Sequence, residues 1–262
     1  MPMVNLGGVL TKPSNYSAWL SPAVGGTAVD TALSYGTKVQ QQVGVALANS
    51  GLKRDRTFVT TKVPCCPDGA PSHMWFSCDD PDGKNTTLAL ERDLHELGLD
   101  AVDLMLVHWP CSTMEETIKT YRALEAFHAA GKARAIGVSN FNVSQLRQLL
   151  AAATVPPAVN QCEFSIGNHD DDALDFCKAH NITYEAYSPL GGLSHVDVLG
   201  DADVQAIARR HNKSAAQVAL RWVVQQGVPF VTAAMNPTFM VEDLDLFDFE
   251  LGGDEMDTLA AK

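Results

Sequence analysis

Basic residues are scarce in this chain, which has 19 Lys and Arg against 31 Asp and Glu and a formal net charge of −12 at pH 7. Nucleic acids and anionic membrane surfaces bind clustered Lys and Arg, so the charge balance excludes both as expected partners. No apolar run reaches the length of a membrane span, and the N-terminal stretch MPMVNLGGVL has no basic segment followed by a long apolar one. We therefore expect a soluble, cytoplasmic protein.

Cysteine is sparse, with six residues in 262. Disulfide frameworks are typical of short secreted chains, so we expect reduced thiols. The long segment PCCPDGAPSHMWFSCDDPDG contains four residues of zinc-ligating type but no C-x-x-C pair, namely Cys65, Cys66, His73 and Cys78. We predict that no metal is bound and that the segment is a substrate-side loop, in which oxidation of Cys65 and Cys66 is a separate hypothesis.

The sequence also lacks the G-x-G-x-x-G turn that follows the first strand of an open, doubly wound α/β sheet; only Gly7-Gly8-Val9 stands there. Short β-rich runs nevertheless alternate with stretches of helical spacing about eight times. Strands are expected at Met3–Leu6, Ala28–Thr31, Phe58–Val63, Val102–His108, Ala133–Val138, Ala158–Glu163, Thr183–Tyr187 and Phe230–Thr232. Helices are expected at Lys38–Ala48, Thr87–Leu97, Met114–Ala130, Val143–Ala152, Asp171–His180 and Ala215–Gln225, with Asn142 or Ser144 opening one and Gly131 closing another. The pattern favours an α/β fold, a single-domain (β/α)8 TIM barrel over residues 1–262.

Polar residues stand at the predicted strand ends, which meet at one mouth of such a barrel. They are Asp30, Tyr35, Lys62, His108, Ser139, Asn140, Gln161, Tyr187 and Ser188. The ordinary pKa of tyrosine is near ~10, but a Lys62 ammonium would lower the pKa of Tyr35, and Asp30 would keep the lysine charged. His108 could donate a hydrogen bond to an oxygen lying between it and Tyr35. Such a set polarises a carbonyl and delivers a proton, while a nicotinamide or flavin supplies hydride.

Each of these residues also has a structural interpretation. A single charged residue at a strand end is commonly a surface ion pair, and His108 could be a hydrogen-bonded core histidine. The convergence of four titratable groups at one mouth favours chemistry over these separate interpretations.

Six motifs, in order along the chain, resemble the aldo-keto reductase family. They are VDTALSYG, TTKV, LGLDAVDLMLVHWP, AIGVSNF, VNQCEF and YEAYSPLGG. The resemblance runs from about Met1 to Asp243. It implies an oxidoreductase that transfers a hydride between a nicotinamide dinucleotide and an aldehyde or ketone, or the corresponding alcohol. It assigns catalysis to Asp30, Tyr35, Lys62 and His108, with Tyr35 as general acid/base.

The resemblance also implies cofactor contacts. Ser139, Asn140 and Gln161 would bind the nicotinamide carboxamide, and Tyr187 would stack on its ring. The full expected set is Gly8, Asp30, Ser139, Asn140, Gln161, Tyr187, Ser188, Leu190, Gly192, Ala234, Asn236, Glu242 and Asp243. The family's cofactor is NADP(H), but Ala233 and Phe239 stand where its phosphate-binding Lys and Arg are usual. NAD(H) is therefore an alternative.

Two further departures concern the barrel ends. The chain begins almost at the first strand, without the family's N-terminal hairpin, and stops at Lys262, without its long C-terminal loop. We expect a more open pocket for a small carbonyl substrate, in a monomer or weak dimer. Its walls are predicted to be Trp19, Trp75, Phe76 and Trp109, although each aromatic residue could instead be packing.

Two other functions remain open. The protein could be a dinucleotide-binding regulatory subunit of the same fold, as potassium-channel β subunits are, with little turnover. A barrel hydrolase using His108 and a metal is disfavoured, because no second strand-end histidine or carboxylate cluster accompanies it.

Overall fold

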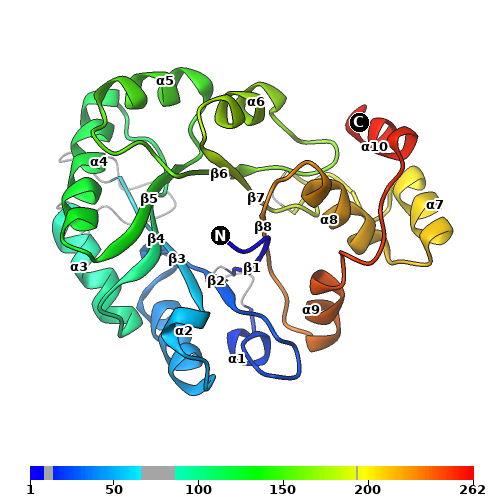
Figure 1. Ribbon diagram of the computed structural model, residues 1–262, viewed down its shortest axis with the longest axis horizontal. Coiled ribbons are helices and arrows are strands. Elements are labelled where there is room, and N and C mark those ends of the chain that lie inside the picture. Colours follow the sequence, from blue (N-terminus) through cyan, green and yellow to red (C-terminus); the bar gives the residue numbers. More distant parts are fainter. Residues whose placement is uncertain (9–13, 66–85, 193) are drawn as a thin grey trace.

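Eight parallel strands form a closed barrel in a computed structural model that describes residues 1–8, 14–65, 86–192 and 194–262. Each strand pairs with the next along the chain, and β8 pairs with β1. The strands are β1 (Val4–Leu6), β2 (Ala28–Asp30), β3 (Phe58–Val63), β4 (Val102–Val107), β5 (Ala133–Ser139), β6 (Val159–Glu163), β7 (Thr183–Tyr187) and β8 (Phe230–Thr232). The predicted (β/α)8 barrel is confirmed, and Figure 1 looks into it along its axis.

Helices surround the strands (Figure 1). They are α1 (Tyr16–Trp19), α2 (Thr37–Asn49), α3 (Thr86–Leu97), α4 (Met114–Ala129), α5 (Val143–Ala152), α6 (Asp171–Ala179), α7 (Ala202–His211), α8 (Ala215–Gln225), α9 (Pro237–Leu244) and α10 (Gly253–Ala260). Two 3-10 turns, Leu33–Tyr35 and Arg54–Arg56, precede α2 and β3. None of the helices among the described residues combines the length and apolarity of a membrane span.

Local capping chemistry fixes where several helices begin and end. Asn142 caps α5 by accepting from the backbone N–H of Gln145, whose side chain accepts in return from the Asn142 N–H. Of the two predicted caps, Asn142 and Ser144, the structure has Asn142. Gly131 follows α4 with φ of 76°, a left-handed conformation that favours glycine at a helix end.

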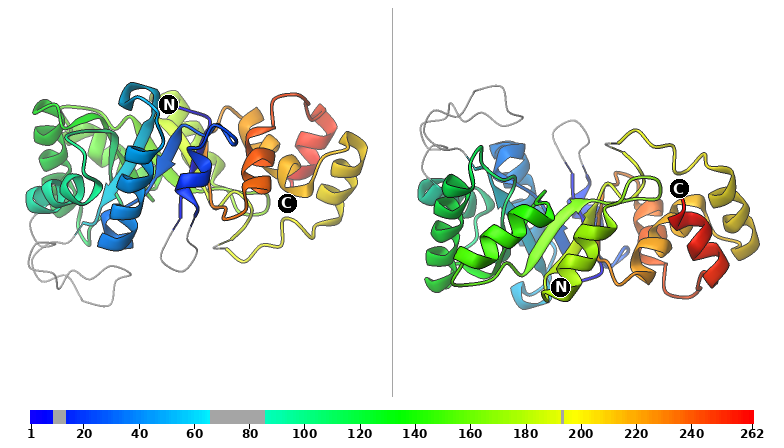
Figure 2. Two further views of the ribbon diagram at one scale, coloured as in Figure 1. Left: turned by 90° about the horizontal axis from the view of Figure 1, so that it is seen from below. Right: turned by 90° about the horizontal axis from the view of Figure 1, so that it is seen from above.

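Four short helices were not expected from the sequence, α1, α7, α9 and α10. Figure 2 shows α7 and α10 side by side on the flank of the barrel, where Arg210 and Glu255 form an ion pair of 2.8 Å between them. Of these, α1 lies between β1 and β2 and α9 follows β8, so both belong to the strand–helix alternation, whereas α7 precedes α8 in the connection from β7 to β8 and α10 follows α9.

The two faces of the strands pack differently. Their outer faces and the facing helices form the main apolar core. Inside the barrel, Leu104, Leu106 and Val159 form a smaller apolar cluster. Phe58 and Ala135 pack against it. A buried polar layer lies beside this cluster, formed by Asn5, Asp30, Thr60, Lys62, Gln161 and Glu185. A barrel interior is ordinarily filled by branched apolar residues, so this layer marks the functional end of the barrel.

Candidate active site

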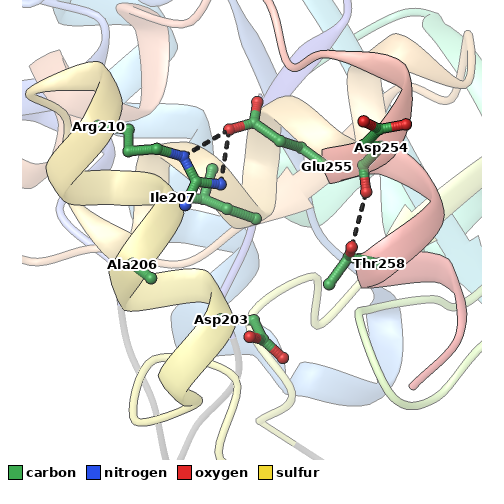
Figure 3. Close-up of a pocket in the computed structure, with 7 residues that line it drawn as sticks. All are labelled: Asp203, Ala206, Ile207, Arg210, Asp254, Glu255 and Thr258. Atoms are coloured by element: carbon green, nitrogen blue, oxygen red, sulfur yellow. Dashed lines mark hydrogen bonds and ion pairs between the residues drawn. The ribbon is translucent and has the colours of Figure 1, made fainter.

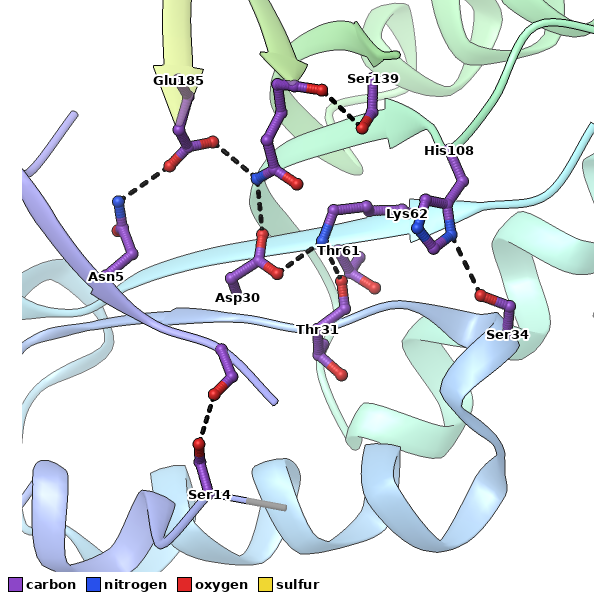
Figure 4. Close-up of polar contacts among 12 residues, drawn as sticks. Asn5, Ser14, Asp30, Thr31, Ser34, Thr61, Lys62, His108, Ser139 and Glu185 are labelled. Carbon is purple, nitrogen blue, oxygen red and sulfur yellow. Dashed lines mark hydrogen bonds and ion pairs between the residues drawn. The ribbon is translucent and has the colours of Figure 1, made fainter. Parts of the chain in front are cut away.

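A buried ion pair forms the centre of the site. Lys62 Nζ lies 2.5 Å from Asp30 Oδ1, and the two side chains are 1% and 4% exposed. Asp30 ends β2 and Lys62 is the penultimate residue of β3, so parallel pairing brings them together (Figure 4). Lys62 also donates to the carbonyl oxygen of Thr31 at 3.0 Å. Burial lowers the pKa of Lys62, but Asp30 and Tyr35 outweigh it and the pKa is raised, so the ammonium stays charged.

Tyr35 lies next to this pair, at the end of the 3-10 turn Leu33–Tyr35. Lys62 Nζ is 5.6 Å from the centroid of its ring. Burial raises the pKa of Tyr35, and the lowering effect of Lys62 is smaller. The sequence-based expectation of a lowered pKa is thus wrong in net direction, because desolvation of the phenolate exceeds the attraction of one cation. Tyr35 therefore holds its proton at neutral pH.

His108 follows β4 directly and lies edge-on to Tyr35, with ring centroids 5.7 Å apart. Burial, and then the Lys62 charge, hold the pKa of His108 well below its ordinary range. The imidazole is therefore neutral, and one ring nitrogen carries a hydrogen. Ser34 Oγ lies 3.0 Å from its Nδ1.

The ends of β5, β6 and β7 supply amide and hydroxyl groups. Asn140 Nδ2 donates to the His108 carbonyl oxygen and to Ser139 Oγ, each at 3.0 Å, and Tyr187 donates to Asn140 Oδ1 at 2.8 Å. Asn140 and Ser188 have φ of 66° and 51°. A left-handed backbone is uncommon outside glycine, and Asn181, His195 and Asn212 have it away from these strand ends. Asp30, Tyr35, Lys62 and His108, the expected catalytic residues, are called the tetrad below. The structure thus joins the predicted β5 and β7 residues to the tetrad through His108.

The residues expected at the far end of a dinucleotide lie in the segments after three strands, and two of them, Glu242 and Asp243, are in α9. They follow β1, β7 and β8, and are Gly8, Ser188, Leu190, Gly192, Ala234, Asn236, Glu242 and Asp243. Asn236 caps α9 by accepting from the Thr238 N–H at 3.0 Å. Asp243 is turned inward: it is buried and accepts from Thr232 Oγ1 at 2.9 Å, and burial raises its pKa to about 6.

The predicted pocket walls divide into three groups. Trp19 is completely buried, and its indole N–H donates to the carbonyl oxygen of Ala28 at 2.8 Å, at the start of β2. Its prediction as a pocket wall is wrong, because the ring fills the core. Trp109 is 39% exposed and stacks beside His108, with centroids 6.4 Å apart. Trp75 and Phe76 lie outside the described residues.

Two cysteines flank the tetrad. Cys65 comes three residues after Lys62 and Cys111 three residues after His108, and the structure joins them by a disulfide with Cα atoms 5.3 Å apart. The expectation of reduced thiols is corrected for this pair, because the ends of β3 and β4 are neighbours although the cysteines are 46 residues apart in sequence. Cys66, His73 and Cys78 lie outside the described residues. In the part of the chain that the structure describes, no group of three or more His, Cys, Asp or Glu residues is arranged to hold a metal ion.

A separate hollow of about 230 Å³ lies between α7 and α10 (Figure 3). Arg210 and Glu255 pair with one another across it, and Thr258 donates to the Asp254 carbonyl oxygen. Its lining comes from outer helices and includes none of the strand-end residues, so we assign it no part in the site.

Sequence reasoning missed two buried residues that touch the site from below. Glu185 on β7 accepts a hydrogen bond from Gln161 at 2.7 Å, and Asn5 on β1 donates to Glu185 at 2.9 Å. A signal was present, because Glu185 stands between apolar neighbours two positions before Tyr187 and so shares its strand face.

Comparisons with known proteins agree with this geometry. The aldo/keto reductase family model matches residues 20–262. The chain is 39% identical to glyoxal reductase of Bacillus subtilis, over 89% of this chain and 77% of that protein. It is 37% identical to morphine 6-dehydrogenase of Pseudomonas putida, over 98% of this chain and 86% of that one.

Solved structures give the same result. An aldo-keto reductase from a Medee basin deep-sea metagenome library superposes with a TM-score of 0.86 at 33% identity, covering 100% of this chain and 91% of that one. A Bombyx mori aldo-keto reductase in complex with NADP superposes with a TM-score of 0.84 at 27% identity, covering 100% and 89%. With its barrel, its strand-end residues and these matches in agreement, the chain belongs to the aldo/keto reductase family.

Proposed function

We propose that this protein reduces aldehydes or ketones, with Tyr35 as the general acid. The observation that carries the proposal is the buried Lys62–Asp30 pair placed beside the Tyr35 ring. Burial keeps the phenol protonated, and the adjacent Lys62 ammonium stabilises the phenolate that remains once the proton has moved to the substrate oxygen. In the reverse direction the same phenolate accepts the proton of an alcohol.

His108 supports the same step from the other side of the substrate oxygen. As a neutral imidazole it donates an N–H hydrogen bond, which polarises a carbonyl without competing with Tyr35 as the proton source. The two rings are 5.7 Å apart between centroids, so one oxygen atom can contact both.

The chain's own residues fit a nicotinamide dinucleotide. Ser139, Asn140 and Gln161 would hold its carboxamide, and Oε1 of Gln161 accepts no hydrogen bond from the described residues. Tyr187, half-buried at the end of β7, would stack on the nicotinamide ring. When bound, the dinucleotide supplies the hydride that no side chain can provide.

We further propose that the 2′-phosphate of NADPH is not required and that NADH is used. Ala233 and Phe239 carry no charge, so neither position offers a cation to a 2′-phosphate. Both are exposed, Phe239 to 57%. The sequence from Trp222 to Ala261 contains no Lys or Arg. A dianionic phosphate there would lack the bidentate partner that such sites use.

For substrates we propose small aldehydes, with glyoxal as the first compound to test, and secondary alcohols in the oxidative direction. The relatives named for glyoxal reduction and morphine dehydrogenation support these two classes. Substrate choice depends on loops around the mouth, so a panel is needed.

The test is a parallel titration with NADH and NADPH, followed by tryptophan fluorescence, and then turnover of an aldehyde and ketone panel. Binding and turnover in the wild type, with binding alone in Tyr35→Phe, would support the reductase. Binding without turnover across the panel would favour the regulatory-subunit alternative. Absence of binding to either dinucleotide would overturn the proposal.

A further inference from the structure

A line of hydrogen bonds crosses the barrel interior and ends at Asp30 and Lys62 of the tetrad (Figure 4). Asn5 Nδ2 donates to Glu185 Oε1 at 2.9 Å, and Gln161 Nε2 donates to Glu185 Oε2 at 2.7 Å. The same Gln161 nitrogen donates to Asp30 Oδ2 at 2.9 Å, and Asp30 binds Lys62 through its other oxygen. These five residues come from β1, β7, β6, β2 and β3, and none is more than 3% exposed.

The arrangement fixes the orientation of the Gln161 amide. An amide nitrogen has two hydrogens, and here Glu185 takes one and Asp30 the other. The nitrogen is therefore fully used. The amide oxygen Oε1 accepts nothing from the described part of the chain and remains available to an incoming N–H donor. Without Glu185 the nitrogen keeps only the Asp30 acceptor, so one of its hydrogens loses its partner and the amide is held by one contact instead of two.

We infer that Glu185 is a positioning residue: together with Asp30 it holds the Gln161 amide so that its oxygen receives the carboxamide N–H of a nicotinamide dinucleotide. The inference rests on the proposed function and extends it to a residue below the site. Glu185 is on the same strand face as Tyr187, two residues deeper in the barrel, so it acts on the cofactor only through Gln161.

The charges around Glu185 fit this role. Burial, and then the Asp30 charge, raise the pKa of Glu185, and the Gln161 hydrogen bond, Lys62 and the Met1 amino group offset them only in part, so that the net pKa is about 8. At neutral pH the carboxyl is mainly protonated, so the Asp30 and Lys62 charges balance within the layer. Asn5 Oδ1 is a buried acceptor without a partner beside it, and a turn of the Asn5 amide would offer it to the carboxyl hydrogen.

A cofactor analogue tests the inference directly. The 3-acetylpyridine analogue of NADH replaces the carboxamide NH2 by a methyl group, so it cannot donate to Gln161. The dissociation constants of NADH and this analogue are measured by fluorescence titration for the wild type, Glu185→Gln and Glu185→Leu. Glutamine at position 185 keeps an oxygen that accepts from Gln161 and has the shape of the neutral acid. Leucine at the same position removes that acceptor. Asp93→Leu is the matched control, since it removes another fully buried carboxyl that does not touch Gln161.

We expect the wild type and Glu185→Gln to prefer NADH over the analogue by about fivefold, the worth of one hydrogen bond. In Glu185→Leu the preference falls to near one, while Asp93→Leu keeps it. A packing role alone would weaken both ligands equally and leave the ratio unchanged, which overturns the inference. Equal binding of both ligands by the wild type also overturns it, even if Glu185→Leu does not fold. Failure of the wild type to bind either NADH or NADPH overturns the proposed function and the inference with it.

Discussion

Ser34 Oγ lies 3.0 Å from Nδ1 of His108, which ties the turn before α2 to the end of β4. Ser34 immediately precedes Tyr35, so the same 3-10 turn carries the proposed acid and holds the imidazole beside it. If Ser34 donates to Nδ1, the ring hydrogen stands on Nε2. A short turn thereby sets the relative placement of the two groups that contact the substrate oxygen in the proposed reaction.

His108 should stay neutral through the whole working range. Burial and the Lys62 charge hold the pKa of His108 well below the ordinary value of 6.5, so no protonation step is expected at pH 6.5 or above. Nitrogen-15 NMR of labelled imidazole should show a neutral ring with hydrogen on Nε2, and Ser34→Ala should shift the tautomer balance and lower kcat several-fold. A ring that charges near pH 6.5 would contradict this environment.

Tyr35 should keep reduction active into alkaline solution. Burial raises the pKa of the phenol above its ordinary value, so the proton-bearing form persists as pH rises and the rate of carbonyl reduction stays flat from pH 6 to 9. Tyr35→Phe should lower kcat by about 10² to 10⁴ and leave the dinucleotide dissociation constant within about twofold. A fall in the reduction rate centred near pH 7 would show that Lys62 outweighs burial after all.

Phe239→Arg should create phosphate recognition. The substitution restores a guanidinium at an exposed position of α9, and a charge-assisted contact should raise the affinity for NADPH relative to NADH by about tenfold. Phe247→Arg is the matched control, because Phe247 is 59% exposed and its substitution adds the same charge outside α9. An equal gain in relative NADPH affinity in both variants would mean that net charge alone causes the effect. A wild type that already binds NADPH much more tightly than NADH would contradict the cofactor proposal.

Asp93 should make stability depend on pH. It is completely buried in α3, accepts from Gln40 and Thr61, and burial raises its pKa from 3.8 to about 7. The folded state therefore holds a proton that the unfolded state releases. The stabilisation is complete below pH 4 and is lost as pH rises through 7, at up to about 1.4 kcal/mol per pH unit. Urea unfolding at several pH values should show that the free energy of unfolding depends less on pH in Asp93→Asn than in the wild type. The exposed control Asp172→Asn should keep the wild-type dependence.

The Cys65–Cys111 disulfide should stabilise the barrel mouth. Closing a loop of 46 residues restricts the unfolded chain by about 4 kcal/mol in the chain-entropy model. Peptide mapping without reductant should recover the two cysteine peptides linked. Dithiothreitol should lower the free energy of unfolding, and Cys111→Ser should reproduce the loss and remove any further response to the reductant. Full alkylation of both thiols in untreated protein would exclude the bond.

The sequence patterns predicted the barrel well because strand periodicity and local caps are short-range signals. Phe58–Val63, Thr183–Tyr187 and Phe230–Thr232 have the predicted bounds, and Val143–Ala152 begins at the predicted Asn142 cap. The outer helices α7 and α10 were not predicted, although Val204 and Ile207 of α7 and Leu259 of α10 pack into the main apolar core, because they lie outside the pattern of one helix after each strand.

The site was predicted less completely, and its misses are long-range. The Cys65–Cys111 bond depends on strand adjacency that one sequence does not display. Trp19 was expected at the mouth, but whether an aromatic ring points to a pocket or a core is decided by the fold around it. The pKa of Tyr35 depends on a balance between burial and one cation, and spacing along the chain measures neither.

The hydrogen bond between Asn5 and Glu185 joins residues 180 positions apart, and that span bears on how the protein is made. Synthesis delivers Asp30 and Lys62 long before β7 and β8 exist. Until the last strand pairs with the first, the charged layer stays open to water and the apolar strand faces stay exposed. Pairings of such long range fold slowly and leave intermediates open to aggregation. Burial of this charged layer therefore depends on the final third of the chain. Translation products that stop before it should expose the layer, and we expect chaperones and proteases to act on them.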